Sequence, residues 1–380
     1  MVRRVVISLV ASIGFAAVYL AWTPAGPVRG VRPSVSAPSV TIAPTSDALT
    51  FARLGTQTIA VSRYVDGEVT GVPIGTPGED AITLVNRLGY DGVRALITAG
   101  GASIRARVAA LAVPVDLLGT HIAAGTNYRE HADEATVDGG PFLFAKYVAP
   151  TPSRAPVPAG DALLDYEVEL CLVTMAPATP GQRATGGLLL CNDVTDRATL
   201  LREVDADHPE SGVGFTSGKS APGYLPVGDL FVVPRDLDAF VQGVTLQLSV
   251  NGTERQRTTA TKWIWDLDRL LVEAGALRDQ TWAYWGGTAR LPFTADGQVP
   301  ARTLLLAGTP GGTVFAGVDV RAIGRGVVRW LAGGWDRPVT RQAIESYIAL
   351  AREQQRYLQP GDRITIRVDG LGSMDSPVVR

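Results

Sequence analysis

The first hydrophobic pattern in the chain is a long apolar run near its start. Val5 to Trp22 carries no charge and follows Arg3 and Arg4. As a helix its 18 residues would span about 27 Å, close to the hydrocarbon thickness of a bilayer. We therefore expect residues 1–22 to be a membrane anchor, with a cleaved signal segment as the alternative. The body of the protein is then expected to be extracytoplasmic, in a periplasm or at a cell surface.

The following residues divide the chain by composition. Residues 23–48 are rich in Pro, Ala, Ser, Val and Thr without helical or alternating periodicity, which is typical of an extended linker. Residues 49–118 indicate a small N-terminal α+β domain. Residues 119–380 are expected to form a larger domain that carries the chemistry.

Within 49–118 the apolar spacing predicts three elements. Apolar stretches on both sides of Asp66-Gly67 predict a β-hairpin within 58–74. Leu, Ile, Val and Ala recur at helical spacing over 80–88 and over 103–111, so a helix is expected at each.

Two glutamates interrupt a strand-like apolar run over 164–171. Alternate residues of a strand point to the same side, so Glu167 and Glu169 are expected to project from one face. Two crowded, partly buried carboxylates repel each other, and a divalent cation is the usual compensation. The alternative is a solvated face of an antiparallel sheet, which is the commoner setting of such a pair.

A second apolar run, over 186–193, ends in Asp193. An aspartate at the end of a strand is well placed to be a third oxygen ligand. Alternation puts Cys171 on the face of the two glutamates and Cys191 on that of Asp193, so the thiols lie close together if the strands are neighbours. The two cysteines are either small buried hydrophobes or the halves of one bridge, and an extracytoplasmic body favours the bridge.

A polar cluster over 125–134 lies between apolar stretches. His131 and Glu134 share a face if this cluster is helical, and a carboxylate there can orient an imidazole and raise its basicity. The alternative is a helix-surface histidine with a chance neighbour. Lys146 ends the next apolar run.

Composition narrows the class of protein. The 35 Lys+Arg residues against 37 Asp+Glu give a net charge of -2, which offers no electrostatic case for nucleic acid. Only three histidines are present, so a His-rich metal site is not expected.

Several blocks occur in an order that resembles the fumarylacetoacetate hydrolase superfamily. The similarity covers about residues 115–315 and 357–377. The blocks are the G-x-N-Y-x-x-H-x-x-E run of Gly125 to Glu134, the D-Y-E-x-E-L run of Asp165 to Leu170, the N-D-V-T-x-R run of Asn192 to Arg197, Gly218-Lys219-Ser220, Val250-Asn251-Gly252, Gly308 to Gly312, and Pro360-Gly361-Asp362.

This resemblance implies a fold and a site. The fold would be a predominantly β, mixed-sheet roll or barrel, often assembled as a homodimer. In fumarylacetoacetases proper, an aspartate before the active-site histidine is a fourth metal ligand. This chain has no clear match to that aspartate, so it resembles the branch of the family with three carboxylate ligands. The implied metal is Mg²⁺, Mn²⁺ or Ca²⁺ on Glu167, Glu169 and Asp193; the implied catalytic residues are His131, Glu134, Lys219 and Lys146; and Thr309, Tyr128 and Arg197 are expected to bind substrate.

The implied function is metal-dependent hydrolysis of a C–C bond in a small 2-oxo or 1,3-dioxo carboxylic acid, such as an acylpyruvate or a compound similar to fumarylacetoacetate. The near alternatives are a hydratase, an isomerase or a decarboxylase of the same architecture. The alternative of another class is a non-catalytic binding protein that kept the fold.

An insertion at about 316–356 departs from the family. Apolar residues at helical spacing predict an amphipathic helix over 339–356. The preceding stretch 325–335 is apolar and aromatic with flanking arginines, and it is interpreted as a membrane-surface contact, a lid or a dimer contact.

Overall fold

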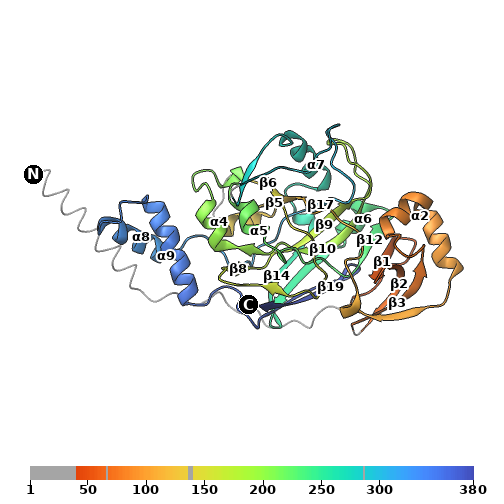
Figure 1. Ribbon diagram of the computed structural model, residues 1–380. Helices are drawn as coiled ribbons and strands as arrows, with labels where there is room; N and C mark the ends of the chain where they lie inside the picture. Colours follow the sequence, from red (N-terminus) through yellow and green to blue (C-terminus); the bar gives the residue numbers. More distant parts are fainter. Residues whose placement is uncertain (1–39, 66, 136–139, 286) are drawn as a thin grey trace, which may run out of the picture.

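A mixed β-sheet forms the centre of the molecule (Figure 1). The structure is a computed structural model that describes residues 40–65, 67–135, 140–285 and 287–380. Within these residues the sheet has ten strands in the order β4-β3-β2-β1-β12-β10-β9-β17-β5-β6. The strands are β1 (Ala48–Leu54), β2 (Gln57–Val65), β3 (Glu68–Ile74), β4 (Ile104–Arg107), β5 (His121–Gly125), β6 (Phe142–Lys146), β9 (Val168–Thr174), β10 (Gly186–Asn192), β12 (Phe231–Pro234) and β17 (Leu304–Leu306).

The predicted α+β fold dominated by strands is confirmed, but the predicted barrel is not. The described sheet is open, ending at β4 on one side and at β6 on the other. Its central strands β9 and β10 are covered on both faces, which explains why their residues are almost continuously apolar rather than alternating.

A second sheet lies against the first, with β13 contacting β9 and β19 contacting β10. Its order is β14-β13-β18-β19-β7. Its strands are β7 (Val157–Pro158), β13 (Thr245–Val250), β14 (Thr253–Thr259), β18 (Arg363–Val368) and β19 (Gly372–Val379). Two further sheets have two strands each: β8 (Leu164–Asp165) pairs with β11 (Thr195–Asp196), and β15 (Trp282–Tyr284) pairs with β16 (Gly287–Ala289).

Helices cover the two ends and one side of this core (Figure 1). At one end α2 lies beside β1–β3, and at the opposite end α8 and α9 lie together beyond α4. The described helices are α2 (Ala81–Ala99), α3 (Arg129–Ala135), α4 (Arg197–Glu203), α5 (Phe215–Lys219), α6 (Leu237–Gln242), α7 (Leu267–Ala276), α8 (Val320–Leu331) and α9 (Val339–Glu353).

Two of the three elements expected in residues 49–118 are confirmed. β2 and β3 pair antiparallel as the predicted hairpin. The helix expected over 80–88 is the first half of α2. Because β1 pairs with β12, these strands continue the central sheet, and a separate domain over 49–118 stays a prediction.

The helix predicted over 103–111 was wrong. Residues 104–107 form β4, which pairs with β3, and only a short 3₁₀ turn over 108–110 follows. Ile104 and Ala106 face inward while Arg105 and Arg107 are exposed, so the period is two rather than 3.6.

The prediction of a membrane-anchored, extracytoplasmic protein is corrected. In the part of the chain that the structure describes, no helix is both long and apolar enough to cross a bilayer. The longest of these helices, α2, carries Arg87, Asp91 and Arg94. The apolar segment 1–22, on which the prediction depended, lies outside the described residues.

The end of the predicted linker is packed against the body. The backbone N–H and the hydroxyl of Thr41 both donate to the Asp369 carboxylate, at 2.7 and 2.6 Å. Ala48, the last residue assigned to the linker, is the first residue of β1. Residues 23–39 of the linker lie outside the described residues.

The insertion forms a helical pair. The amphipathic helix predicted over 339–356 is confirmed as α9, and most of the apolar stretch 325–335 belongs to α8. The two helices approach closely at Gly326, where a Cβ would lie 2.5 Å from the backbone nitrogen of Ala343. In turn, α9 packs on α4.

Asp80 ties α2 to the segment before β17. Its buried carboxylate accepts from the N–H groups of Thr83 and Asp116, both at 3.0 Å, and pairs with Arg302. Burial raises the pKa of Asp80, but the bonds donated by Arg302 and by these N–H groups outweigh burial and hold the pKa at about 2.

We expect Asp80→Asn to lower the free energy of unfolding at pH 7 by about 2 kcal/mol, measured by urea titration. The folded pKa lies below the ordinary value of 3.8, so this stability is present above about pH 4 and is lost as the pH falls through about 2. Asp238→Asn is the control, because Asp238 and its partner Arg183 are exposed. A stability difference for Asp80→Asn that is the same at pH 2 and pH 7 would contradict this assignment.

Candidate active site

Glu167 and Glu169 lie where the chain passes from β8 into β9. The single strand predicted over 164–171 is interrupted, because Glu167 belongs to neither strand. Its N–H donates to the side-chain oxygen of Asn192 and its carbonyl accepts from the N–H of Asp193, both at 2.9 Å. These bonds replace regular ladder pairing and fix the Glu167 backbone.

Asp193 directly follows β10, the antiparallel neighbour of β9. Glu167, Glu169 and Asp193 are all buried, and each contributes a carboxylate oxygen that lies within 4.8 Å of those of the other two. The structure therefore brings together the three carboxylates that the sequence placed at adjoining strand ends.

Two buried lysines face this cluster. Lys219, the last residue of α5, places Nζ 2.5 Å from Glu167 and 2.8 Å from Asp193. Lys146, the last residue of β6, places Nζ 2.5 Å from Asp193. Asp193 is thus held from two sides.

Arg197 supplies a third buried cation from the first turn of α4. Its guanidinium lies 2.5 Å from Glu167 and 2.9 Å from Asp165. Asp165 also accepts from the N–H groups of Val314 and Phe315, at 2.9 and 3.1 Å. Arg197 and Asp165 therefore connect the carboxylate cluster to the segment that leads into the insertion.

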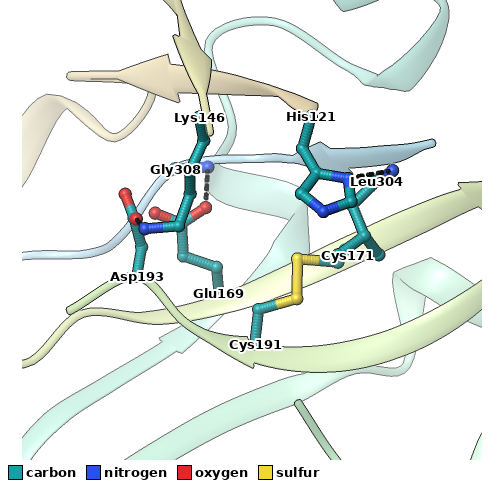
Figure 2. Close-up of a disulfide and its surroundings, with 8 residues drawn as sticks. All are labelled: His121, Lys146, Glu169, Cys171, Cys191, Asp193, Leu304 and Gly308. Atoms are coloured by element: carbon teal, nitrogen blue, oxygen red, sulfur yellow. Dashed lines mark hydrogen bonds and ion pairs between the residues drawn. A yellow bond between two sulfur atoms is a disulfide. The ribbon is translucent and has the colours of Figure 1, made fainter. Parts of the chain in front are cut away.

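Glu169 is the one carboxylate of the cluster that forms no ion pair with these three cations. Its carboxylate accepts a hydrogen bond from the N–H of Gly308, at 2.8 Å (Figure 2). Burial, and the nearby charges of Asp193 and Glu167, raise the pKa of Glu169 well above 4.5. Burial also opposes ionisation of Glu167, but Lys219 and Arg197 outweigh it and hold the pKa of Glu167 at about 2.

The charge balance of the cluster fits a divalent cation. Four buried carboxylates, those of Asp165, Glu167, Glu169 and Asp193, face the three cations Lys146, Lys219 and Arg197. The excess negative charge and the all-oxygen donor set are features of Mg²⁺, Mn²⁺ and Ca²⁺ sites.

His131 and Glu134 lie three residues apart on α3, as predicted. His131 is buried and lines the same cavity as Glu167. Burial lowers the pKa of His131 to about 4, so its imidazole is neutral at neutral pH. Glu134 accepts from the N–H of Gly312 at 2.7 Å, which ties α3 to the loop after β17.

A cavity of about 170 Å³ adjoins the cluster. Thr309, Lys219 and Arg197 line it together with His131 and Glu167. The other five predicted site residues do not line it: Tyr128, Glu134, Lys146, Glu169 and Asp193. Tyr128 and Lys146 are 1% and 0% exposed, respectively, and lie in the packed interior.

Sequence reasoning missed Gln256, which joins β9 to the loop after β17. Its amide nitrogen donates to the Thr309 hydroxyl at 2.9 Å, and its amide oxygen accepts from the N–H of Val168 at 3.0 Å. The Thr309 hydroxyl in turn donates to the Val168 carbonyl at 3.0 Å. No motif pointed to Gln256, because its role depends on a contact between distant strands. Asp165 and Asn192 were within recognised blocks and could have been found there.

Cys171 and Cys191 form a disulfide between β9 and β10 (Figure 2). Of the two interpretations of these cysteines, the bridge is confirmed. Cys191 lies opposite Glu169 in the strand register, and Cys171 lies two residues beyond Glu169. The bridge therefore joins the two strands directly beside Glu169 and Asp193.

Removing this bridge is expected to destabilise the protein. The Cys171→Ala, Cys191→Ala double variant should lose about 3 kcal/mol in free energy of unfolding, the value for a closed loop of about 20 residues. Urea unfolding of the variant, and of wild type with and without reductant, measures the loss. Equal stability of oxidised and reduced wild type would show that the bridge contributes nothing.

The family profile described as fumarylacetoacetate (FAA) hydrolase C-terminal matches residues 120–379. A 2,4-didehydro-3-deoxy-L-rhamnonate hydrolase from Sphingomonas sp. (strain SKA58) is 25% identical over 209 residues, 52% of this chain and 69% of that protein. An oxaloacetate tautomerase from Escherichia coli (strain K12) is 27% identical over 192 residues, 48% of this chain and 83% of that protein.

Solved structures share the fold. A probable 2-hydroxyhepta-2,4-diene-1,7-dioate isomerase from Mycobacterium abscessus aligns with a TM-score of 0.54 at 21% identity, covering 87% of this chain and 98% of that one. A maleylpyruvate hydrolase from Sphingobium sp. SYK-6, solved with manganese(II) and pyruvate, aligns with a TM-score of 0.54 at 18% identity. The alignment covers 87% of this chain and 99% of that one. The family profile spans well over half of the sequence and includes every residue of the carboxylate cluster, and the chain therefore belongs to the fumarylacetoacetate hydrolase family of enzymes.

Proposed function

We propose that the protein is a metal-dependent hydrolase that cleaves a C–C bond in a small 2-oxo or 1,3-dioxo carboxylic acid. The observation that carries this proposal is the convergence of three buried carboxylates, one of which, Glu167, lines the same cavity as the neutral imidazole of His131. Two relatives named as hydrolases support it, one of them solved with manganese(II) and pyruvate.

Glu167, Glu169 and Asp193 would hold the metal, with Mg²⁺ and Mn²⁺ the leading candidates and Ca²⁺ also suited to the oxygen donors. A bound divalent ion supplies Lewis-acid polarisation of substrate carbonyl groups. Lys146 and Lys219 hold the Asp193 carboxylate in place, so the donor set is preorganised. We assign Lys146 to positioning, because it is fully buried behind Asp193.

His131 is proposed to be the general base. Its neutral imidazole can take a proton from water, whose hydroxyl then adds to the acyl carbonyl carbon. The bond between this acyl carbon and the neighbouring carbon of the 2-oxo acid then breaks. The electron pair of the bond stays on the carbon of the 2-oxo acid fragment, which takes up a proton. Glu134 lies on the same helix face and is held by the N–H of Gly312, a position from which it can orient the imidazole.

Lys219, Arg197 and Thr309 are proposed to contact substrate because all three line the cavity. Burial lowers the pKa of Lys219, but Asp193 and Glu167 outweigh burial and raise it, so the ammonium keeps its charge. This charge can stabilise the substrate carboxylate or the developing oxyanion. Tyr128 is proposed to support the site from the core rather than to touch substrate.

Tautomerisation of a 2-oxo acid is the second candidate. It is favoured by the relative named as an oxaloacetate tautomerase and by the solved relative named as an isomerase. The Lys219 ammonium, together with a divalent cation held by the three carboxylates, would stabilise an enolate without an activated water, so His131 would be dispensable.

Product analysis separates the two candidates. Purified protein with Mn²⁺ is incubated with 2,4-dioxopentanoate, with oxaloacetate and with a 2-oxo-enoic diacid, and products are read by mass spectrometry and proton exchange by NMR. Equal amounts of pyruvate and acetate from 2,4-dioxopentanoate are expected. Enolisation without C–C cleavage would favour the tautomerase, and no reaction with any substrate would contradict both.

A further inference from the structure

We propose that the cavity selects a substrate with an apolar tail, so that the substrate is an acylpyruvate with an alkyl or aryl acyl group rather than a dicarboxylate. This inference rests on the proposed function, because it names the substrate class of the same site. It follows from the wall of the cavity, from the pairing of its cations and from the support that the insertion gives to the wall.

One part of the cavity lining is apolar, and we refer to it as the apolar wall. It is built by α4, the loop after it, the start of α5 and the segment before α8. Its members are Leu200, Leu201, Val204, Pro209, Phe215 and Phe315. Such a surface gains free energy by covering an alkyl or aryl group, whereas a carboxylate placed against it loses hydration without a partner.

The cations that line the cavity are already engaged. Arg197 is paired with Asp165 and Glu167, and Lys219 spans Glu167 and Asp193. A second substrate carboxylate would have to compete with these buried ion pairs.

The insertion supports this wall. Leu201 lies in one buried apolar cluster with Ile344 and Ile348 of α9. The ring of Phe315 packs edge-on against Tyr347 of α9, with centroids 5.9 Å apart. The departure from the family at 316–356 therefore shapes the substrate cavity through α4 and Phe315.

Two matched substrates measure the effect of an apolar against a charged substrate tail on cleavage. 2,4-Dioxoheptanoate and 2,4-dioxoheptanedioate differ only in a terminal methyl against a terminal carboxylate. Water adds at C4 and the C3–C4 bond breaks, with its electron pair and one proton going to C3. The first substrate then gives butanoate and pyruvate, and the second gives succinate and pyruvate. We expect kcat/KM of the full-length protein with Mn²⁺ to be at least about 100-fold higher for the first.

A binding measurement separates this inference from the proposed hydrolysis. 2-Oxoheptanoate and 2-oxoheptanedioate lack the C4 carbonyl and cannot be cleaved, and calorimetry with Mn²⁺ gives their Kd values. The monoacid is expected to bind at least about tenfold tighter. If the monoacid binds tighter and no dioxo acid is cleaved, the cavity does select an apolar tail, but the proposed hydrolysis is wrong. Cleavage without preference, equal Kd values or no binding of either acid overturns the apolar selection.

A variant tests the wall itself. Val204, at the C-terminal end of α4, is only half-buried, so Val204→Lys can be accommodated with its amine directed to the cavity mouth. This variant should narrow or reverse the preference for the monoacid, while Val204→Met should keep it. Melting temperature and Mn²⁺ affinity close to those of wild type verify the fold of both variants. An unchanged preference in a folded Val204→Lys variant would contradict the location of the tail.

Discussion

Glu169→Gln is expected to abolish divalent-metal binding at the carboxylate cluster and to lower kcat/KM by at least about 10³-fold. Glu169 is the carboxylate of the cluster whose negative charge lacks a paired cation, so its loss removes the excess charge that a divalent ion would compensate. Gln keeps the size of the side chain and an oxygen to accept from the N–H of Gly308. Metal content of the purified variant and Mn²⁺ calorimetry measure the loss.

The same substitution is expected to leave the metal-free protein as stable as wild type, or more stable. Burial disfavours the Glu169 carboxylate, so a neutral amide at this position relieves an unfavourable charge. Asp229→Asn is a matched control, because Asp229 is also buried but accepts from Tyr64 and Ser373 outside the cluster. Unchanged metal content in Glu169→Gln would overturn the proposed site, and an equal loss in Asp229→Asn would show that the effect is not local.

His131→Ala is expected to lower kcat for C–C hydrolysis by about 10²–10⁴-fold while Mn²⁺ affinity stays within a few-fold of wild type. His131 lines the cavity but does not belong to the carboxylate cluster, so we expect it to act on water rather than to bind the metal. Steady-state kinetics with 2,4-dioxopentanoate measure the first effect, and calorimetry measures the second.

The pH profile provides an independent check on His131. Burial holds its pKa at about 4, below the usual 6.5, so the imidazole is a competent base at neutral pH and loses this role only as the pH falls toward 4. The profile of kcat/KM should therefore show no inflection from His131 near pH 6.5. His208→Gln serves as the control, because His208 is an exposed histidine. Full hydrolytic activity in His131→Ala would favour the tautomerase or another reaction without activated water.

The carboxylate cluster was largely predictable because its residues follow local rules. Period-two alternation placed Glu167 and Glu169 together, and the apolar run before Asp193 identified a neighbouring strand end. The same alternation brought Cys171 and Cys191 to one place. The break between β8 and β9 was not predictable, because it depends on a hydrogen bond from the Glu167 backbone to a side chain 25 residues away.

Elements whose structure depends on distant contacts were predicted less well. Residues 104–107 became β4 because β3 provides an edge for them, although apolar spacing over 103–111 suggested a helix. The cavity role of Leu201 and Phe315 depends on how α9 packs on α4, which no local pattern encodes. The apolar run over 1–22 satisfied the rules of length and hydropathy for a membrane span, but no helix of the described residues is both long and apolar enough.

A crystal structure of the protein grown with Mn²⁺, with diffraction recorded at the manganese absorption edge, will show whether the three carboxylates hold a metal ion. We expect one strong anomalous peak, with oxygens of Glu167, Glu169 and Asp193 at about 2.0–2.6 Å from the ion. An anomalous map without a peak at these carboxylates, with Lys219 still bridging Glu167 and Asp193, would contradict the proposed metal site.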